Sequence, residues 1–186
     1  MSRVDDILDF WFGGTNRERS WFAPDAEFDR TCTANFIGDC RAAASGELDA
    51  WKGDARSCLA LTLLLDQLPR NIFRGTARAF AADERARAVA HHALARGFDR
   101  ELLPRQRAFL YTPLEHSENA DDQLESVRLF RALAAENPDS ASYVAYAEEH
   151  CETIRRFGRF PHRNEVLGRE STPAEREFLE RKKSER

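Results

Sequence analysis

The sequence predicts an all-α protein, a single domain over residues 1–186 with about seven to eight antiparallel helices. The first observation is that apolar residues recur three and four positions apart, which is the period of a helix buried on one face. The second is that no segment alternates apolar and polar residues as a half-buried strand does. The third is that the connections between the apolar segments are short, as in packed helical proteins.

Two helices are predicted in the first 46 residues. Apolar residues keep helical spacing from Val4 to Trp11, and the pair Gly13-Gly14 ends that helix. Pro24 is placed as a first-turn proline of the second helix, which ends at Ser45-Gly46. The buried stripe of this second helix consists of Phe28, Cys32, Phe36 and Cys40.

The middle of the chain is punctuated by prolines and glycines. The run CLALTLLL over 58–65 is rich in leucine rather than in β-branched residues, which favours a buried helix over a strand. We expect Pro69 to break this helix and to push Leu68 out of helical dihedrals. Asp83 is expected to cap a further helix, with Gly97 in its C-terminal stop position.

The last third of the chain predicts four more helices. Pro104 opens a short one that is interrupted at Pro113, and others cover about 121–135 and 140–157. The sequence Thr172-Pro-Ala-Glu175 is typical of a capping box with proline at the first helical position.

Composition and charge limit the classes of function. The formal net charge of −4 disfavours binding to nucleic acid or to anionic membranes through charge alone. No apolar run approaches the roughly 18 residues of a membrane span. The N-terminus carries an acidic pair where a signal peptide needs positive charge. We therefore expect a cytoplasmic protein with neither nucleic acid nor a membrane as partner.

Three polar clusters interrupt the helical pattern, and the first lies within 65–83. Asp66 stands at the C-terminal end of a buried helix, where the helix dipole opposes a negative charge, so it needs a cationic partner. In one interpretation the cluster binds a ligand; in the other its residues staple a broken helix. The candidate ligand-binding residues are Asp66, Gln67, Arg70, Asn71 and Arg74.

The second cluster is the segment YTPLEHSEN over 111–119. A histidine beside a carboxylate can act as an acid–base pair near neutral pH, which makes His116 and Glu118 catalytic candidates. The structural interpretation is that Ser117 caps the next helix beside a hydrogen-bonded histidine.

The third cluster is RRFGRFPHRNEVLGR over 155–169, a concentration of arginine in an acidic protein. Gly158 and Pro161 preclude a continuous helix, so the polar residues between them and after them lie on a constrained loop. His162 is a third catalytic candidate, and the loop adds three candidate ligand-binding residues: Arg159, Arg163 and Asn164.

Motifs for metals and common cofactors are missing from the sequence. No histidine has a glutamate three residues before it, and there is no H-E-x-x-H, Cys/His zinc spacing, P-loop, G-x-S-x-G or G-x-G-x-x-G. We therefore predict no metal and no cofactor.

The three clusters also carry a resemblance. The blocks LDQLPRNIFRGTARAFAAD, FLYTPLEHSE and RFGRFPHRNEVLGRES resemble those of a mainly bacterial family catalogued as domain of unknown function 924, over about 4–180. The resemblance implies an all-helical fold similar to tetratricopeptide-like superhelices, and it implies no established activity. Leu68 departs from the family pattern, which usually has an aromatic residue there, and Glu115 stands where an apolar residue is usual.

Two classes of function follow from these observations. If the clusters converge, their arginines, histidines and carboxylates form a pocket for a small anionic molecule, either a carboxylate or a phosphate, with acid–base chemistry available. The alternative is a helical module that holds a peptide or protein partner. Arg163→Lys separates a binding role, which predicts a loss of about 1 kcal/mol or less, from a structural role, which predicts several.

Overall fold

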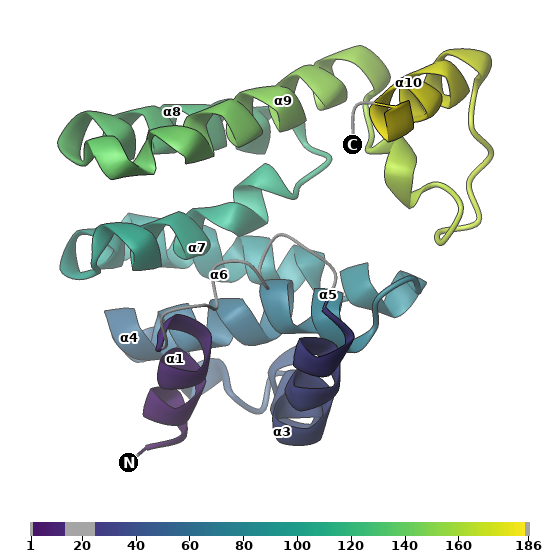
Figure 1. Ribbon diagram of the computed structural model, residues 1–186. Helices are drawn as coiled ribbons and strands as arrows, with labels where there is room; N and C mark the ends of the chain where they lie inside the picture. Colours follow the sequence, from purple (N-terminus) through teal and green to yellow (C-terminus); the bar gives the residue numbers. More distant parts are fainter. Residues whose placement is uncertain (1, 14–24, 185–186) are drawn as a thin grey trace. The chain divides into compact units, whose positions relative to one another are not determined.

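The computed structural model describes residues 2–13 and 25–184, and within them it confirms the all-α prediction. These residues form helices and no strand (Figure 1). Gly14 and Pro24, which were expected to end and open helices, lie outside the described residues. In chain order the α-helices are α1 (Arg3–Phe12), α3 (Ala26–Ser45), α4 (Ala55–Thr62), α5 (Leu68–Ile72), α6 (Asp83–Arg96), α7 (Pro104–Glu115), α8 (Ala120–Glu136), α9 (Ala141–Phe157) and α10 (Pro173–Ser184).

The chain divides into two compact units. The first comprises Met1–Arg74 and Arg78–Pro113, and the second comprises Gly75–Ala77 and Leu114–Arg186. The first unit therefore holds α1, α3–α6 and most of α7, and the second holds α8–α10. That residues 1–186 form one domain stays a prediction.

The core of the first unit is built from the stripes that the sequence predicts. Ile7, Leu8 and Trp11 of α1 are buried, and so is the predicted stripe of α3 from Phe28 to Cys40. Helix α4 is buried on nearly every side, which explains why its sequence is a continuous apolar run rather than a periodic one.

The helix that precedes Pro69 does not break there, and this prediction is wrong. The chain continues through a π-helical turn over Leu63–Gln67 into α5, and Leu68 keeps helical dihedrals at φ −59° and ψ −38°. In the wider turn the Leu68 N–H donates to the Leu63 carbonyl. The Arg70 side chain donates to the Asp66 carbonyl. The π turn lets the helix pass a residue that has no N–H of its own.

Helix α7 likewise continues past Pro113, contrary to the prediction that it is interrupted there. Proline removes the N–H that would pair with the carbonyl four residues earlier, that of Phe109. The Thr112 hydroxyl lies 2.9 Å from this carbonyl and 3.0 Å from Asp66 Oδ2, and it shares its one proton between these two acceptors. A neighbouring side chain thus compensates for the proline.

The predicted helix that follows Asp83 is present, but its cap differs. Ala82 is the N-cap residue and makes no side-chain cap hydrogen bond, whereas Asp83 is the first helical residue. The Asp83 carboxylate pairs instead with Arg70 at 3.0 Å. Gly97 ends the helix in the left-handed conformation at φ 71°, as predicted.

The second unit is built on a helical hairpin. Helices α8 and α9 lie side by side and are joined by a short turn over Pro138–Ser140 (Figure 1). Phe130, Leu133, Ala147 and Ile154 form its buried core. Gly158 then ends α9 at φ 68°, and the chain reaches α10 through a segment that contains the 3-10 helix η6 (Pro161–Arg163).

Phe130 tests the core of this hairpin. Its ring is fully buried, so Phe130→Ala should leave a cavity and lower the free energy of unfolding by about 3–5 kcal/mol. Leu124 on the same helix is 63% exposed, and Leu124→Ala should change it by about 0.5 kcal/mol or less. Urea unfolding of both variants checks this, and equal losses would contradict the packing described.

Candidate functional site

The first predicted cluster is a buried charge network in the first unit. Asp66 lies in the π turn, is fully buried and pairs with Arg70 at 3.1 Å. Its carboxylate also accepts hydrogen bonds from Thr112 Oγ1 at 3.0 Å and Gln67 Nε2 at 2.7 Å. Arg70 forms ion pairs with both Asp66 and Asp83 and so bridges the two carboxylates. A buried charge needs such partners, and Asp66 has the cationic one that the sequence predicts.

Asn71 and Arg74, the remaining candidates of this cluster, hold Asp29 of α3. Arg74 donates to the two carboxylate oxygens at 2.7 and 2.8 Å, and Asn71 Nδ2 donates at 2.9 Å. The Arg74 hydrogen bonds lower the pKa of Asp29. The five polar residues therefore connect α5 with α3, α6 and α7 inside the first unit.

The second and third clusters meet in the second unit, at the carboxylate of Glu118. It accepts the Phe160 backbone N–H at 2.7 Å and two guanidinium N–H groups of Arg169, at 2.7 and 3.0 Å. Burial raises the pKa of Glu118, but the hydrogen bonds from Arg169 and Phe160 outweigh it and leave the pKa below its ordinary value. Glu118 is thus an ionised anchor for the loop that follows α9.

Arg163 makes the second connection between these clusters. It is 6% exposed, and its Nη2 donates to the His116 carbonyl at 2.9 Å. Its guanidinium carbon lies 4.7 Å from the centre of the Phe160 ring. Segments 111–119 and 155–169 therefore meet as predicted. Thr112 contacts the first cluster within the first unit, while convergence of that cluster with His116, Glu118 and the third cluster stays a prediction.

Three histidines gather beside this connection. The ring centres of His116 and His150 are 6.3 Å apart. The centre of the Phe160 ring lies 5.3 Å from that of His150 and 5.5 Å from that of His162. His150 Nδ1 also lies 3.3 Å from Glu115 Oε1. Although part of His162 is exposed, crowding by neighbouring atoms lowers its pKa, and the Arg163 cation lowers it further.

The cap of α8 differs from the structural interpretation of Ser117. Asn119 is the N-cap residue and accepts the N–H groups of Asp121 and Asp122. Ser117 is buried; its hydroxyl donates to Asp122 at 2.7 Å and accepts the Asn119 N–H. Gln123, which is also buried, donates to the Glu115 and Ser117 carbonyls, both at 2.6 Å. These contacts fix the connection that carries His116 and Glu118.

Arg159 connects the loop with α10. It donates Nε–H and Nη2–H to the two carboxylate oxygens of Glu175, at 2.7 and 2.9 Å. Glu175 is 3% exposed and also accepts the Thr172 N–H at 2.7 Å, as the predicted capping box requires. Hydrogen bonds from Arg159, followed by those from Thr172, lower the pKa of Glu175 to about 2.

Asn164, the last candidate, is a buried part of the loop. Its Nδ2 donates to Ser171 Oγ at 3.0 Å, and its carbonyl accepts the Arg169 N–H at 2.8 Å. Both contacts close the segment on itself. Asn164 therefore holds the loop in shape.

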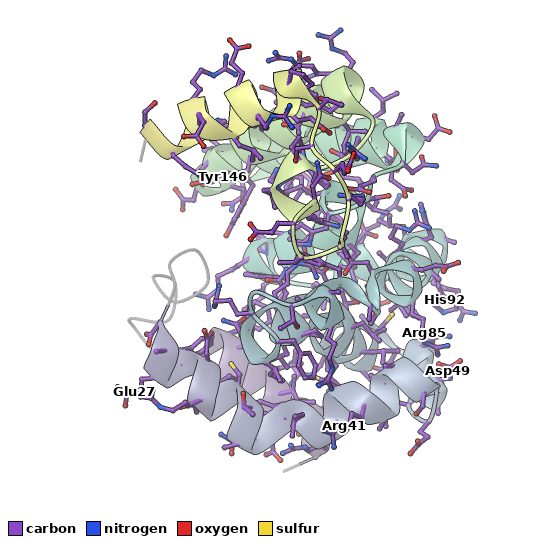
Figure 2. The ribbon with its side chains drawn as sticks, turned by 90° about the vertical axis from the view of Figure 1, so that its right-hand side faces the viewer. Glu27, Arg41, Asp49, Arg85, His92 and Tyr146 are labelled. Atoms are coloured by element: carbon purple, nitrogen blue, oxygen red, sulfur yellow. The ribbon has the colours of Figure 1, made fainter. Side chains whose placement is uncertain are left out.

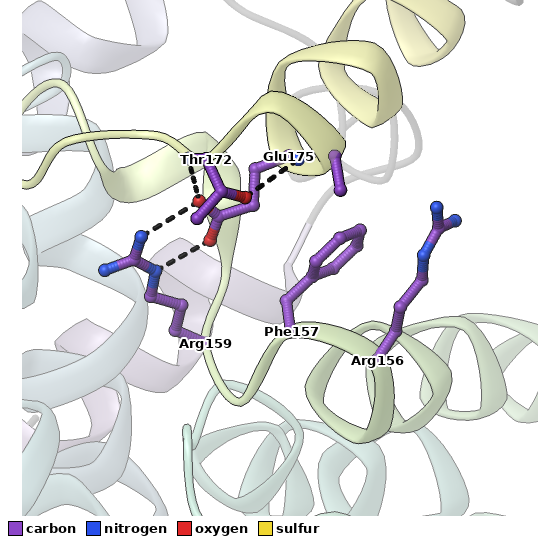
Figure 3. A pocket seen from close by; sticks show the side chains of 6 residues that line it. Arg156, Phe157, Arg159, Thr172 and Glu175 are labelled. Atoms are coloured by element: carbon purple, nitrogen blue, oxygen red, sulfur yellow. Dashed lines mark hydrogen bonds and ion pairs between the residues drawn. The ribbon is translucent and has the colours of Figure 1, made fainter.

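A pocket of about 470 Å³ lies where α9 ends and α10 begins. Arg156 and Phe157 rise from α9 towards α10, and the Arg159–Glu175 pair stands on the other side of the Phe157 ring (Figure 3). The Phe157 ring packs against Phe178 with centres 5.1 Å apart. The lining residues are Arg156, Phe157, Arg159, Thr172, Ala174 and Glu175.

Sequence reasoning named Arg159 as a ligand-binding candidate but missed most of this lining. For Glu175 the sequence contains a signal, the capping box, but that motif predicts the start of a helix rather than an ion pair with Arg159. No sequence signal distinguishes Arg156 as a pocket residue, because an arginine in the last turn of a helix is common.

Within residues 2–13 and 25–184, no three or more His, Cys, Asp or Glu side chains lie where they could hold a metal ion together. None of the helices in that part of the chain is both long and apolar enough to cross a bilayer.

The fold and the site define a helical protein whose polar loop is held by internal ion pairs beside a small pocket. Residues 7–183 match the family described as bacterial protein of unknown function (DUF924), so the chain belongs to this family and the resemblance is confirmed. A solved structure, that of the protein of unknown function ATU0120 from Agrobacterium tumefaciens, is 44% identical. The match has a TM-score of 0.87 and covers 96% of this chain and 97% of that one. No curated protein matches the sequence.

Arg163→Lys tests whether Arg163 is structural. A lysine keeps the charge but loses the planar group that stacks on Phe160 while donating to the His116 carbonyl. We expect the free energy of unfolding to fall by about 1.5–3 kcal/mol, measured in urea. Arg155→Lys, at an exposed residue, is the control, with a change of about 0.5 kcal/mol or less. If Arg163→Lys lowers the free energy of unfolding by a similarly small amount, the structural role is wrong and a binding role for Arg163 is favoured.

Glu175 makes the free energy of unfolding depend on pH in the acidic range. Its folded pKa of about 2 lies below the ordinary 4.5, so its pair with Arg159 stabilises the fold fully above about pH 4.5 and loses this effect as the pH falls towards 2. Glu175→Gln should remove that part of the acid dependence and lower the free energy of unfolding at pH 7 by about 1.5–3 kcal/mol.

Urea unfolding at several pH values measures both effects of Glu175→Gln. Glu152→Gln is the matched control, because Glu152 pairs with Arg155 on an exposed helix face. An acid dependence in Glu175→Gln equal to that of the unchanged protein would refute the assignment.

Proposed function

We propose that the second unit binds a small anionic molecule in the pocket between the end of α9 and the start of α10. The observation that carries the proposal is that Arg156 lines the pocket and that the ion pairs of the described residues do not include it, although the charge of Glu152, four residues earlier on α9, acts on it. Its guanidinium carbon lies 4.7 Å from the centre of the Phe157 ring, which leaves its N–H groups available to an anion.

The arginines predicted as clamps contribute to this pocket indirectly. Arg159 is engaged by Glu175, and Arg163 donates to the His116 carbonyl, so neither can turn towards a ligand without losing a protein partner. They hold the walls, and Arg156 contacts the anion. This division follows from hydrogen-bond geometry, because each guanidinium N–H points in a fixed direction.

Acid–base chemistry belongs to the same proposal. His116 and His162 are the proton-transfer candidates, and the lowered pKa of His162 keeps its imidazole neutral and makes it a weaker proton acceptor than an ordinary histidine. Glu118 supports them as an ionised group on the same connection as His116. A cytoplasmic location stays the prediction of the sequence.

Binding measurements test the proposal. Isothermal titration of the full chain with inorganic phosphate, acetate and 3-phenylpropionate should detect a site for at least one of these anions. Arg156→Gln should weaken that site about 10- to 100-fold, the equivalent of one or two hydrogen bonds to a charged group. Arg155→Gln, the neighbouring exposed arginine, should leave it unchanged. Equal affinity in the two variants would defeat the proposal.

The alternative is a helical interaction module with tetratricopeptide-like stacking. The α8–α9 hairpin resembles the helical pair from which such arrays are built, and Tyr146 projects from the α9 surface with 49% of its area exposed (Figure 2). Exposed aromatic residues are frequent anchors at interfaces. A peptide partner whose binding is lost in Tyr146→Ala but kept in Arg156→Gln would favour this alternative.

A further inference from the structure

We infer that the ligand of this pocket is a monocarboxylate with an apolar group, such as a short-chain or aryl-substituted acid. The inference rests on the proposed function and narrows it from anions in general to one chemical class. It follows from the charge, the lining and the hydrogen-bond donors of the pocket.

The charge of the lining suits a single negative charge. Arg159 and Glu175 neutralise each other through two hydrogen bonds, which leaves the single positive charge of Arg156. A carboxylate cancels that charge. A phosphate dianion brings a second negative charge that the lining does not balance.

The floor of the pocket is apolar. The Phe157 ring is held in place by Phe178, and Ala174 adds a methyl group beside it. Covering this surface removes apolar area from water, which an acid with a phenyl or alkyl group does and acetate does not. The volume of about 470 Å³ falls within the range of small-molecule sites.

The donors around the pocket also disfavour phosphate. Helix N-termini often bind phosphate through free backbone N–H groups, but here the Thr172 N–H donates to Glu175 Oε2 and the Glu175 N–H donates to Thr172 Oγ1. The Thr172 side chain also hydrogen-bonds to the Glu175 carboxylate and helps to lower its pKa, so these groups satisfy one another. The guanidinium of Arg156 alone can donate two N–H groups to the two oxygens of a carboxylate.

Isothermal titration with related probes tests the inference on the full chain. We expect 3-phenylpropionate and hexanoate to bind at least tenfold more tightly than acetate or inorganic phosphate. The neutral analogue 3-phenylpropionamide should bind at least tenfold more weakly than the acid. Arg156→Gln should lower the affinity for 3-phenylpropionate at least tenfold, and Arg155→Gln should not.

A second variant reports on the apolar part. Ala174 is exposed, so Ala174→Leu is compatible with folding while it narrows the space above the Phe157 ring. We expect it to weaken 3-phenylpropionate at least tenfold and to leave acetate within about twofold; an equal effect on both would overturn the inference.

The outcomes separate the two claims. If phosphate or acetate binds as tightly as 3-phenylpropionate and the binding depends on Arg156, the apolar-acid inference is wrong and the proposed function stands. If no anion binds, or if the amide binds as well as the acid, the proposed function fails and the inference fails with it.

Discussion

The second unit depends on one carboxylate, that of Glu118. It accepts the Phe160 N–H and the Arg169 guanidinium, two groups nine residues apart, and so closes the segment between them against the connection from α7 to α8. Charge-assisted hydrogen bonds of this kind are about twice as strong as neutral ones. With both ends of the segment held, Arg163 reaches the His116 carbonyl, and Arg159, just before the segment, reaches the buried Glu175. The walls of the pocket follow from this closure.

The first unit uses charge in a similar way at a different place. A helix with a proline in its path would normally kink, and a buried aspartate at its C-terminal end would normally be costly. The π turn solves both problems. Its wider hydrogen-bonding pattern accommodates Pro69, which has no N–H to donate, and it places Asp66 where Arg70, Thr112 and Gln67 reach its carboxylate oxygens. Polar residues that stand out in the sequence can thus serve the fold completely.

Most of the fold could be predicted from signals a few residues apart, whereas the geometry of the candidate site depends on contacts between residues distant in sequence. Helical spacing, the glycine after α6 and the capping box of α10 all depend on residues a few positions apart, so they could be found in the sequence. The proline predictions failed because each considered one residue, whereas the Thr112 hydroxyl and a π turn supplied the compensation. Glu118 and Arg169 are 51 residues apart, and no periodicity indicates such a pairing.

An acidic protein can gather arginines in one segment without forming a basic surface, because the acids that neutralise them come from elsewhere in the chain. Glu118 precedes the segment and takes Arg169, while Glu175 follows it and takes Arg159. What distinguishes an arginine of this segment as a binding residue is therefore not its membership of a charged run but whether a carboxylate or a backbone carbonyl of the protein already holds it. By that criterion Arg159 and Arg169 support the structure. Arg156, in the last turn of α9, lines the pocket and has a charge to offer a ligand.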